Sequence, residues 1–349
     1  MSLIGIVKSS NCGSIVDNIV KELLEREVFR FLEVQICEDD LDKLIDCDVV
    51  ICFGFRLHLS VTENIFSKLL HATSVGCHIL FWTHESFWDH QSNSGYFQFG
   101  RFFHHMNCYT GDVFTSEKSF YFGEYGKFWA DSSKCKVERP SKDFLFNRFN
   151  SEKRKKVCAY ATRFDDVYFN NQPHSLTQTR NKLIEYLHSK GCCSVFGNGW
   201  ESKLGVPINS TRSGVENRSW GAVKLEESSA SFSFSVCLEN SVIKHYVTEK
   251  ISHSLEAWLI PIYCFDNDLK GFDTSAAINI SKDMSNADLE AVYDTVVNMG
   301  FEEYFDRLST LIENYNAHLV SRDKLKEHRL QPIIRIEQKI GYLISRITL

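Results

Sequence analysis

Residues 237–265 read CLENSVIKHYVTEKISHSLEAWLIPIYCF, and this stretch decides the fold class. Two apolar runs flank a polar patch, which contains Glu-Asn-Ser at 239–241 and Tyr-Val-Thr-Glu-Lys at 246–250. The pattern predicts a strand ending near 240, a helix over 246–259 and a second strand over 260–265. A protein core disfavours so many charged groups, whereas a ligand that carries phosphates and hydroxyls can bind them. The stretch therefore predicts a ligand-binding strand–turn–helix unit.

Strand and helix patterns alternate along the rest of the chain as well. In the first half, strands are predicted at 3–9, 48–55 and 77–83, and helices at 14–27 and 62–76. The second half repeats the alternation, with predicted strands at 156–164, 192–199, 231–240, 260–265 and 276–280 and helices at 175–191, 246–259, 286–299 and 302–319. Two successive βαβ series predict an α/β fold of two Rossmann-like doubly wound domains, with ligands at the carboxyl ends of the strands.

The charged run NSEKRKK at 150–156 is the predicted boundary between the halves. The predicted domains are therefore 1–150 and 151–325, followed by an amphipathic helix at 326–349. An apolar stripe on this helix contains Ile333, Ile336 and Ile340. Packing across the domain boundary and binding to a membrane surface both explain such a stripe, and packing is the preferred interpretation.

Composition limits the partners and the compartment. A net charge of -6 argues against a nucleic-acid partner, which favours a basic surface. No window contains 18 uncharged apolar residues, and the start of the chain lacks the pattern of a signal peptide. The 12 cysteines have neither zinc-site nor redox spacing, so we expect reduced thiols in the interior. The predicted location is cytoplasmic, with at most a peripheral contact at the inner membrane face through the C-terminal helix.

Two cations occupy similar positions at the starts of predicted helices. Lys250 follows Thr248, which is the expected N-cap of its helix, and Arg180 follows Thr177 in the same way. Helix N-termini and cations both favour anions, so two such ends facing one crevice describe a pyrophosphate site. For either cation alone, a solvated surface charge is the preferred interpretation, and the two together with Glu239, Asn240 and Tyr246 favour a binding site. Glu249 repels a phosphate, and a sugar hydroxyl is its expected partner.

The segment 238–263 resembles the donor-binding signature of the α-1,3/4-fucosyltransferases, glycosyltransferase family ten. The family pattern has Glu-Asn-Ser, several residues, Tyr-Val-Thr-Glu-Lys, an alanine-containing helix and Pro-Ile or Pro-Val, and all of these occur here. The resemblance implies a GT-B fold, GDP-β-L-fucose as the donor, and inversion that gives an α-linked fucoside. It also implies that Arg180 and Lys250 neutralise the pyrophosphate, that Tyr246 and Glu249 hold the nucleotide or its ribose, and that Asn240 lies in the same pocket.

A second, shorter resemblance concerns the first half of the chain. The segment ILFWTHESFWDH at 79–90 is similar to a family segment in which an aromatic strand ends in a turn carrying Glu-Ser. The match implies that Glu85 is the general base that removes the proton of the acceptor hydroxyl. The segment 104–126 resembles another family segment more loosely, with Cys108 in place of the usual tryptophan.

A possible metal-binding motif also occurs in the sequence, shortly after the segment 238–263. Asp-x-Asp within FDND at 265–268 is the metal signature of transferases of a different fold, and a turn is the preferred interpretation. We expect no required cofactor, and a divalent metal to act at most as a stimulant. The sequence thus predicts an inverting transferase that moves fucose from GDP-fucose to an oligosaccharide or glycolipid, in lipopolysaccharide biosynthesis or protein glycosylation, through an α-1,3 or α-1,4 linkage. The alternatives are transfer of another GDP-sugar and a glycan-binding protein without catalysis.

Overall fold

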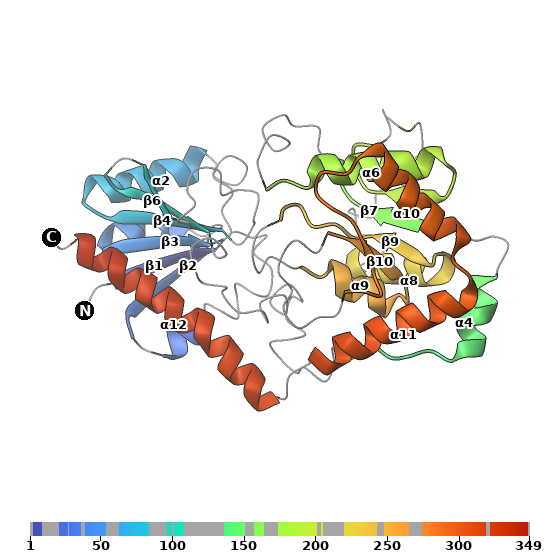
Figure 1. Cartoon of the computed structure of the whole chain (residues 1–349). Helices are drawn as coiled ribbons and strands as arrows, with labels where there is room; N and C mark the ends of the chain where they lie inside the picture. The colour runs from blue at the N-terminus through green and yellow to red at the C-terminus, as the bar shows by residue number, and fades with distance from the viewer. Residues whose placement is uncertain are drawn as a thin grey trace. The chain divides into compact units, whose positions relative to one another are not determined.

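A computed structural model describes residues 3–8, 21–26, 28–35, 39–53, 63–83, 96–99, 101–107, 136–150, 157–163, 174–200, 204, 220–242, 248–264, 274–318 and 322–347. The chain forms two compact units (Figure 1). Unit 1 is built mainly from Met1–Ser132 and Ser321–Leu349, and unit 2 mainly from Ser133–Val242 and Tyr246–Val320. Each unit has its own β-sheet with helices packed against it, so the predicted α/β fold with two doubly wound sheets is confirmed.

Unit 1 has a six-stranded sheet in the order β2-β1-β3-β4-β6-β5. All neighbouring strands are parallel except β5, which runs antiparallel to β6 at the edge. The sequence did not predict the β5–β6 hairpin, because aromatic residues obscure the period of that stretch. The described elements are β1 (Leu3–Lys8), β2 (Arg30–Gln35), η1 (Asp39–Asp46), β3 (Val49–Phe53), α2 (Glu63–Ser74), β4 (His78–Thr83), β5 (Tyr96–Phe99), β6 (Phe103–Asn107) and α12 (Arg322–Ile347).

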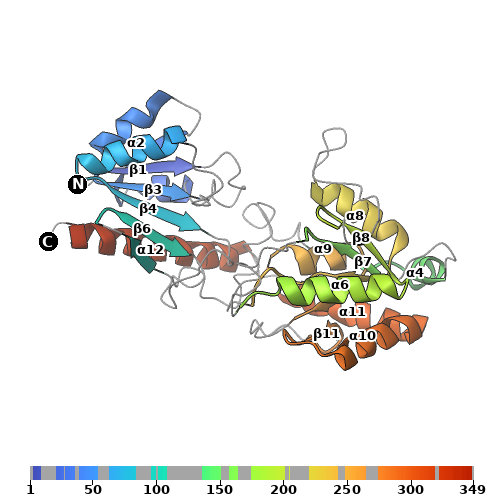
Figure 2. The ribbon, with the colours of Figure 1, turned by 90° about the horizontal axis from the view of Figure 1, so that it is seen from above.

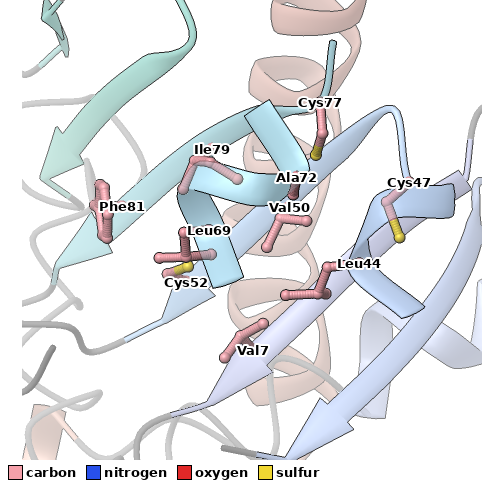
Figure 3. Close-up of a cluster of buried hydrophobic side chains, with 10 residues drawn as sticks. All are labelled: Val7, Leu44, Cys47, Val50, Cys52, Leu69, Ala72, Cys77, Ile79 and Phe81. Atoms are coloured by element: carbon pink, nitrogen blue, oxygen red, sulfur yellow. The ribbon is translucent and has the colours of Figure 1, made fainter. Parts of the chain in front are cut away.

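Figure 3 shows the core on the α2 face of this sheet. Alternate residues of the strands point to this face, including Val50 and Cys52 of β3 and Ile79 and Phe81 of β4. Intervening residues such as Ile51 and Leu80 are equally buried, so both faces of the sheet are covered. Burial on both faces explains why these strands are nearly continuous apolar runs in the sequence.

The C-terminal helix α12 covers the opposite face of the unit 1 sheet from α2 (Figure 2). Its stripe of Ile333, Ile336 and Ile340 is fully buried. The Arg26 guanidinium donates to both carboxylate oxygens of Glu337, at 2.6 and 3.0 Å. The apolar stripe is therefore part of the unit 1 core, where it cannot also contact a membrane surface.

Unit 2 has a five-stranded sheet in the order β11-β10-β9-β7-β8, and every neighbouring pair is parallel. Helices α6 and α10 lie on one face of the sheet, and α8 and α9 lie on the other (Figure 1). The described elements are α4 (Lys142–Phe149), β7 (Val157–Tyr160), α6 (Thr177–Ser189), β8 (Cys193–Phe196), α8 (Trp220–Ser231), β9 (Phe234–Val236), α9 (Lys250–Glu256), β10 (Ile260–Tyr263), β11 (Ile278–Asn279), α10 (Asn286–Asn298) and α11 (Phe301–His318).

Helix α4 joins unit 2 although it precedes the boundary that the charged run suggested. Arg148 explains the attachment, because its Nη2 donates to the carbonyl oxygens of Phe232 at 2.8 Å and Ala257 at 2.9 Å. These carbonyls lie at the carboxyl ends of α8 and α9, where a guanidinium also interacts favourably with the helix dipoles. The units therefore divide at Ser132 and Ser133, ahead of the predicted 150/151.

The cysteines and the helices of the described residues agree with two expectations from composition. Eight cysteines are free and buried, which confirms for these residues that the thiols fill the interior. Burial raises the pKa of Cys77, Cys158 and Cys237 to about 12, so these thiols stay protonated and unreactive. Within the described part of the chain, none of the helices has the length and hydropathy needed to cross a bilayer.

Candidate active site

The predicted donor-site residues that the structure describes lie at one edge of the unit 2 sheet. In this sheet β7 is the first strand, β8 lies on one side of it and β9 on the other, so the direction of winding reverses between β7 and β9. Ligands of doubly wound folds bind at such a reversal, beyond the carboxyl ends of the strands. Glu239 and Asn240 follow β9, and residues 161–163 follow β7. This edge is therefore the expected ligand site.

Glu239 is a buried carboxylate at the centre of the site, with only 1% of its surface exposed. It accepts hydrogen bonds from Thr248 N at 2.7 Å, Thr248 Oγ1 at 2.8 Å, Lys250 Nζ at 3.0 Å and Tyr263 OH at 3.2 Å. A buried carboxylate is stable when its oxygens are bonded in this way. Glu239 thus fixes the start of α9 and the position of the Lys250 ammonium, rather than facing the ligand itself.

Lys250 is bonded inside the site but keeps 19% of its side chain exposed. Besides Glu239, its ammonium donates to Thr248 Oγ1 at 2.7 Å, and the Glu249 carboxylate lies 3.8 Å away. Burial acts to lower the pKa of Lys250, but Glu239 and Glu249 outweigh it and raise the pKa above the usual value. Lys250 therefore remains charged at neutral pH, as binding of a phosphate requires.

Arg180 is held by the residue next to Glu239. Its Nη1 donates to Asn240 Oδ1 at 2.8 Å, its Nη2 donates to Thr162 O at 3.2 Å, and only 3% of the residue is exposed. A backbone hydrogen bond from Leu176 N to Asn240 O, 3.0 Å long, ties the start of α6 to the same residue. Consecutive residues after β9 thus hold the two predicted cations, with Lys250 on Glu239 and Arg180 on Asn240.

Glu249 is ionised next to these cations. Burial acts to raise its pKa, but Lys250, Lys224 and His253 together lower it to about 2. As an acceptor of hydrogen bonds near two ammonium groups, Glu249 suits a sugar hydroxyl better than a phosphate. This geometry is consistent with the predicted partner of Glu249.

Both predicted N-caps are wrong. The N-cap of α6 is Leu176 and that of α9 is Glu249, and neither makes a side-chain cap hydrogen bond. The threonine hydroxyls are bonded elsewhere, since Thr248 donates to Glu239 and Thr177 Oγ1 lies 2.7 Å from Ser175 Oγ. Helix α9 has only 7 residues and starts at Lys250 itself. Anion binding at this position therefore depends on the lysine side chain rather than on the helix end.

The turn after β8 supports the site from the side of β7. Gly197 has φ +117°, and a Cβ there would overlap the carbonyl oxygen of Ala161. Trp200 Nε1 donates to the same oxygen at 2.7 Å, and Arg163 lies over the Trp200 ring at 5.4 Å. The turn therefore packs directly on the segment that bonds Arg180 through Thr162.

Sequence reasoning did not identify every residue of the site. Lys224 of α8 interacts electrostatically with the charged groups of Glu249 and Lys250. The helix that carries Lys224 was not predicted from the sequence. The structural role of Glu239 was also missed, although a glutamate directly after a buried strand and close to a lysine is a usable signal for a buried ion pair. Tyr246 and Glu85 lie outside the described residues, as does the Asp-x-Asp of 265–268. No cluster of three or more potential metal ligands occurs among the residues with described positions.

Comparison with known proteins agrees with the signature. Residues 161–163, Arg180, Lys224, Glu239 and Lys250 all lie within the segment 151–321, which matches the model of the glycosyltransferase family 10 (fucosyltransferase) C-terminal region. No curated protein matches the chain.

Solved structures align with the chain over nearly its whole length, at low identity. An α1,3-fucosyltransferase matches with 18% identity over 95% of this chain and 90% of its own, with a TM-score of 0.43. A structure of an α1,3-fucosyltransferase with GDP-fucose matches with 17% identity over 95% of this chain and 90% of its own, with a TM-score of 0.42. A glycosyltransferase involved in avilamycin A biosynthesis matches with 10% identity over 96% and 98%, with a TM-score of 0.38. The assignment rests on the family model: residues 151–321 of this chain form a domain of glycosyltransferase family 10, and the chain is a glycosyltransferase.

Proposed function

We propose that the protein is an inverting fucosyltransferase that transfers L-fucose from GDP-β-L-fucose to a hydroxyl of an oligosaccharide or glycolipid, with an α-1,3 or α-1,4 linkage. One observation carries the proposal: two consecutive residues, Glu239 and Asn240, hold Lys250 and Arg180 at the winding reversal of the unit 2 sheet. Two fixed cations at the place where these folds bind nucleotides suit a diphosphate. The family match supports fucose as the sugar.

The proposed reaction is a single displacement. The acceptor oxygen attacks the anomeric carbon of fucose as the bond from that carbon to the β-phosphate oxygen breaks, so the configuration changes from β to α. The negative charge that develops on GDP is stabilised by Lys250 and Arg180, which are already in position before the reaction. These cations supply the charge that a divalent metal provides in other transferases, and the proposal therefore includes no metal.

Three other residues complete the proposed site. Glu249 accepts a hydrogen bond from the ribose, and Tyr246 contributes its hydroxyl to the nucleotide. Glu85 removes the proton of the acceptor hydroxyl as the new bond forms, because a neutral hydroxyl is a poor nucleophile. Unit 1 thus supplies the base and binds the acceptor, and unit 2 binds the donor.

Replacing Glu85 with glutamine tests the catalytic part of the proposal. The glutamine cannot accept the proton, so transfer is expected to fall by about 10²- to 10⁴-fold while GDP binding is unchanged. Release of GDP from GDP-fucose is measured with a panel of oligosaccharide acceptors, and GDP affinity is measured by calorimetry. Asp89→Asn, a loss of a carboxylate four residues away, serves as the control. Transfer by Glu85→Gln at the wild-type rate contradicts the assignment of the base.

Transfer of a different GDP-sugar is the second candidate. The described contacts of Arg180, Lys250 and Glu249 suit the diphosphate and the ribose, which all GDP-sugars share. Comparison of GDP-fucose with GDP-mannose as donors distinguishes the two candidates.

A further inference from the structure

Lys224 lies close to the proposed donor site, on helix α8. Its ammonium is 5.9 Å from the centre of the Tyr160 ring, and Tyr160 is the last residue of β7. The Tyr160 ring in turn stacks on Phe196, the last residue of β8, with 4.4 Å between the ring centres. Helix α8 thus brings Lys224 to the carboxyl ends of the strands, where the ligand is expected.

Without a ligand, the site has more positively charged side chains than negatively charged ones. Lys250 contacts Glu239 and Glu249, so the two carboxylates can balance Lys250 and Arg180. In its protonated form Lys224 then gives the site a net positive charge, counting Lys250, Arg180, Glu239 and Glu249 among the described residues. Its ammonium also has no hydrogen bond or ion pair within the described residues, unlike Lys250 and Arg180.

The surroundings of Lys224 disfavour its charge. Burial lowers the pKa of Lys224, and the nearby ammonium of Lys250 also lowers it. The carboxylate of Glu249 acts in the opposite direction, but the net shift is downward. The thiols of Cys158 and Cys237 also face it, but their pKa of about 12 keeps them neutral. A half-buried ammonium with no counter-ion in contact is costly, and a bound anion removes that cost.

We infer that Lys224 is a third cation of the donor pocket and binds the diphosphate of the nucleotide sugar. The inference rests on the proposed function, because it assigns a further contact to the same donor. A nucleotide sugar carries two negative charges on its diphosphate, and the net positive charge from Lys224 favours their binding. The cation–π contact with Tyr160 orients the ammonium without neutralising it.

The test compares two ligands that differ only in the diphosphate. GDP is titrated into the protein by calorimetry, and the affinity for guanosine is obtained by its displacement of bound GDP. In Lys224→Met the side chain keeps its apolar part and loses the charge, whereas Lys224→Arg keeps the charge. Lys190→Met is the matched control, because Lys190 also lies over tyrosine rings, at 5.2 Å from Tyr186 and 5.0 Å from Tyr293, but follows the far end of α6 from Arg180.

Lys224→Met is expected to weaken GDP binding by about 10- to 100-fold, the effect of a charge-assisted hydrogen bond, and to leave guanosine binding unchanged. Lys224→Arg and Lys190→Met are expected to bind GDP nearly as the wild type does. If Lys224→Met binds GDP as tightly as the wild type, or weakens guanosine and GDP equally, the inference is wrong and the proposed function stands. If the wild type binds neither ligand, the proposed function itself fails and the inference fails with it.

Discussion

Glu239→Gln is expected to reduce the free energy of unfolding by about 3–5 kcal/mol, because it leaves Lys250 without its buried partner. The carboxylate accepts four hydrogen bonds, two at each oxygen. One donor at each oxygen, Thr248 N or Lys250 Nζ, cannot accept a hydrogen bond, so the glutamine amide N–H faces a group that only donates in either orientation. Lys250 is no longer held in place, so GDP binding is expected to be lost as well. Urea denaturation measures the stability, and calorimetry of the folded variant measures GDP binding.

An exposed glutamate in a salt bridge provides the control for this substitution. Glu302 accepts a hydrogen bond from Lys142 at 2.6 Å, but 71% of its side chain is exposed to solvent. Glu302→Gln is expected to change stability by less than about 1 kcal/mol, because exposed ion pairs contribute little. A Glu239→Gln protein that is as stable as Glu302→Gln and binds GDP normally shows that Glu239 does not organise the site.

Arg180→Met is expected to weaken GDP binding by about 100-fold, since removal of a buried, hydrogen-bonded charge from a binding site costs roughly 2–5 kcal/mol. Lysine keeps the charge but lacks the planar group that bonds Asn240 and Thr162 together, so Arg180→Lys is expected to recover only part of the affinity. The affinities are measured by calorimetric titration with GDP.

Arg307→Met is the control for Arg180→Met. Arg307 forms a half-exposed ion pair with Glu303 within α11, and its loss is not expected to affect GDP binding. Wild-type affinity of Arg180→Met for GDP contradicts the assignment of Arg180 to the diphosphate, whatever the result for Glu239.

Much of the fold could be predicted from the sequence because parallel strands buried on both faces leave uninterrupted apolar runs. The runs at 48–55 and 260–265 became β3 and β10, and their separation by helical segments predicted the two sheets. Helices α4 and α8 were missed. The sequence of α8, WGAVKLEESSAS, contains a glycine and several serines and lacks a clear apolar period, so its contacts with the rest of unit 2 stabilise it instead.

Four of the described residues of the candidate site were named from the sequence, but their arrangement was not predicted. Lys250, Arg180, Asn240 and Glu249 were identified from charge and position, and the structure brings them together at the expected edge of the sheet. The hydrogen bonds that hold Lys250 and Arg180 in place could not be predicted, because the sequence does not show which buried acceptor each donor reaches. Threonine next to a helix start predicts a cap, yet the nearby Glu239 is a stronger acceptor for the Thr248 hydroxyl.

The C-terminal helix shows what an apolar stripe alone can establish. The spacing of Ile333, Ile336 and Ile340 predicted an amphipathic helix, and this helix is present as α12. The same stripe suits a membrane surface or a protein core, and only the neighbours of the helix decide between them. Here the stripe is buried in unit 1, and Glu337 beside it bonds Arg26.

Calorimetric titration of the wild-type protein with GDP, GDP-fucose and GDP-mannose, without added metal, tests the central claim most directly. The claim is that Glu239 and Asn240 hold Lys250 and Arg180 in position for the diphosphate of GDP-fucose. We expect GDP and GDP-fucose to bind and GDP-mannose to bind more weakly. If none of the three binds, the paired cations are not a nucleotide site, and the proposed function is wrong.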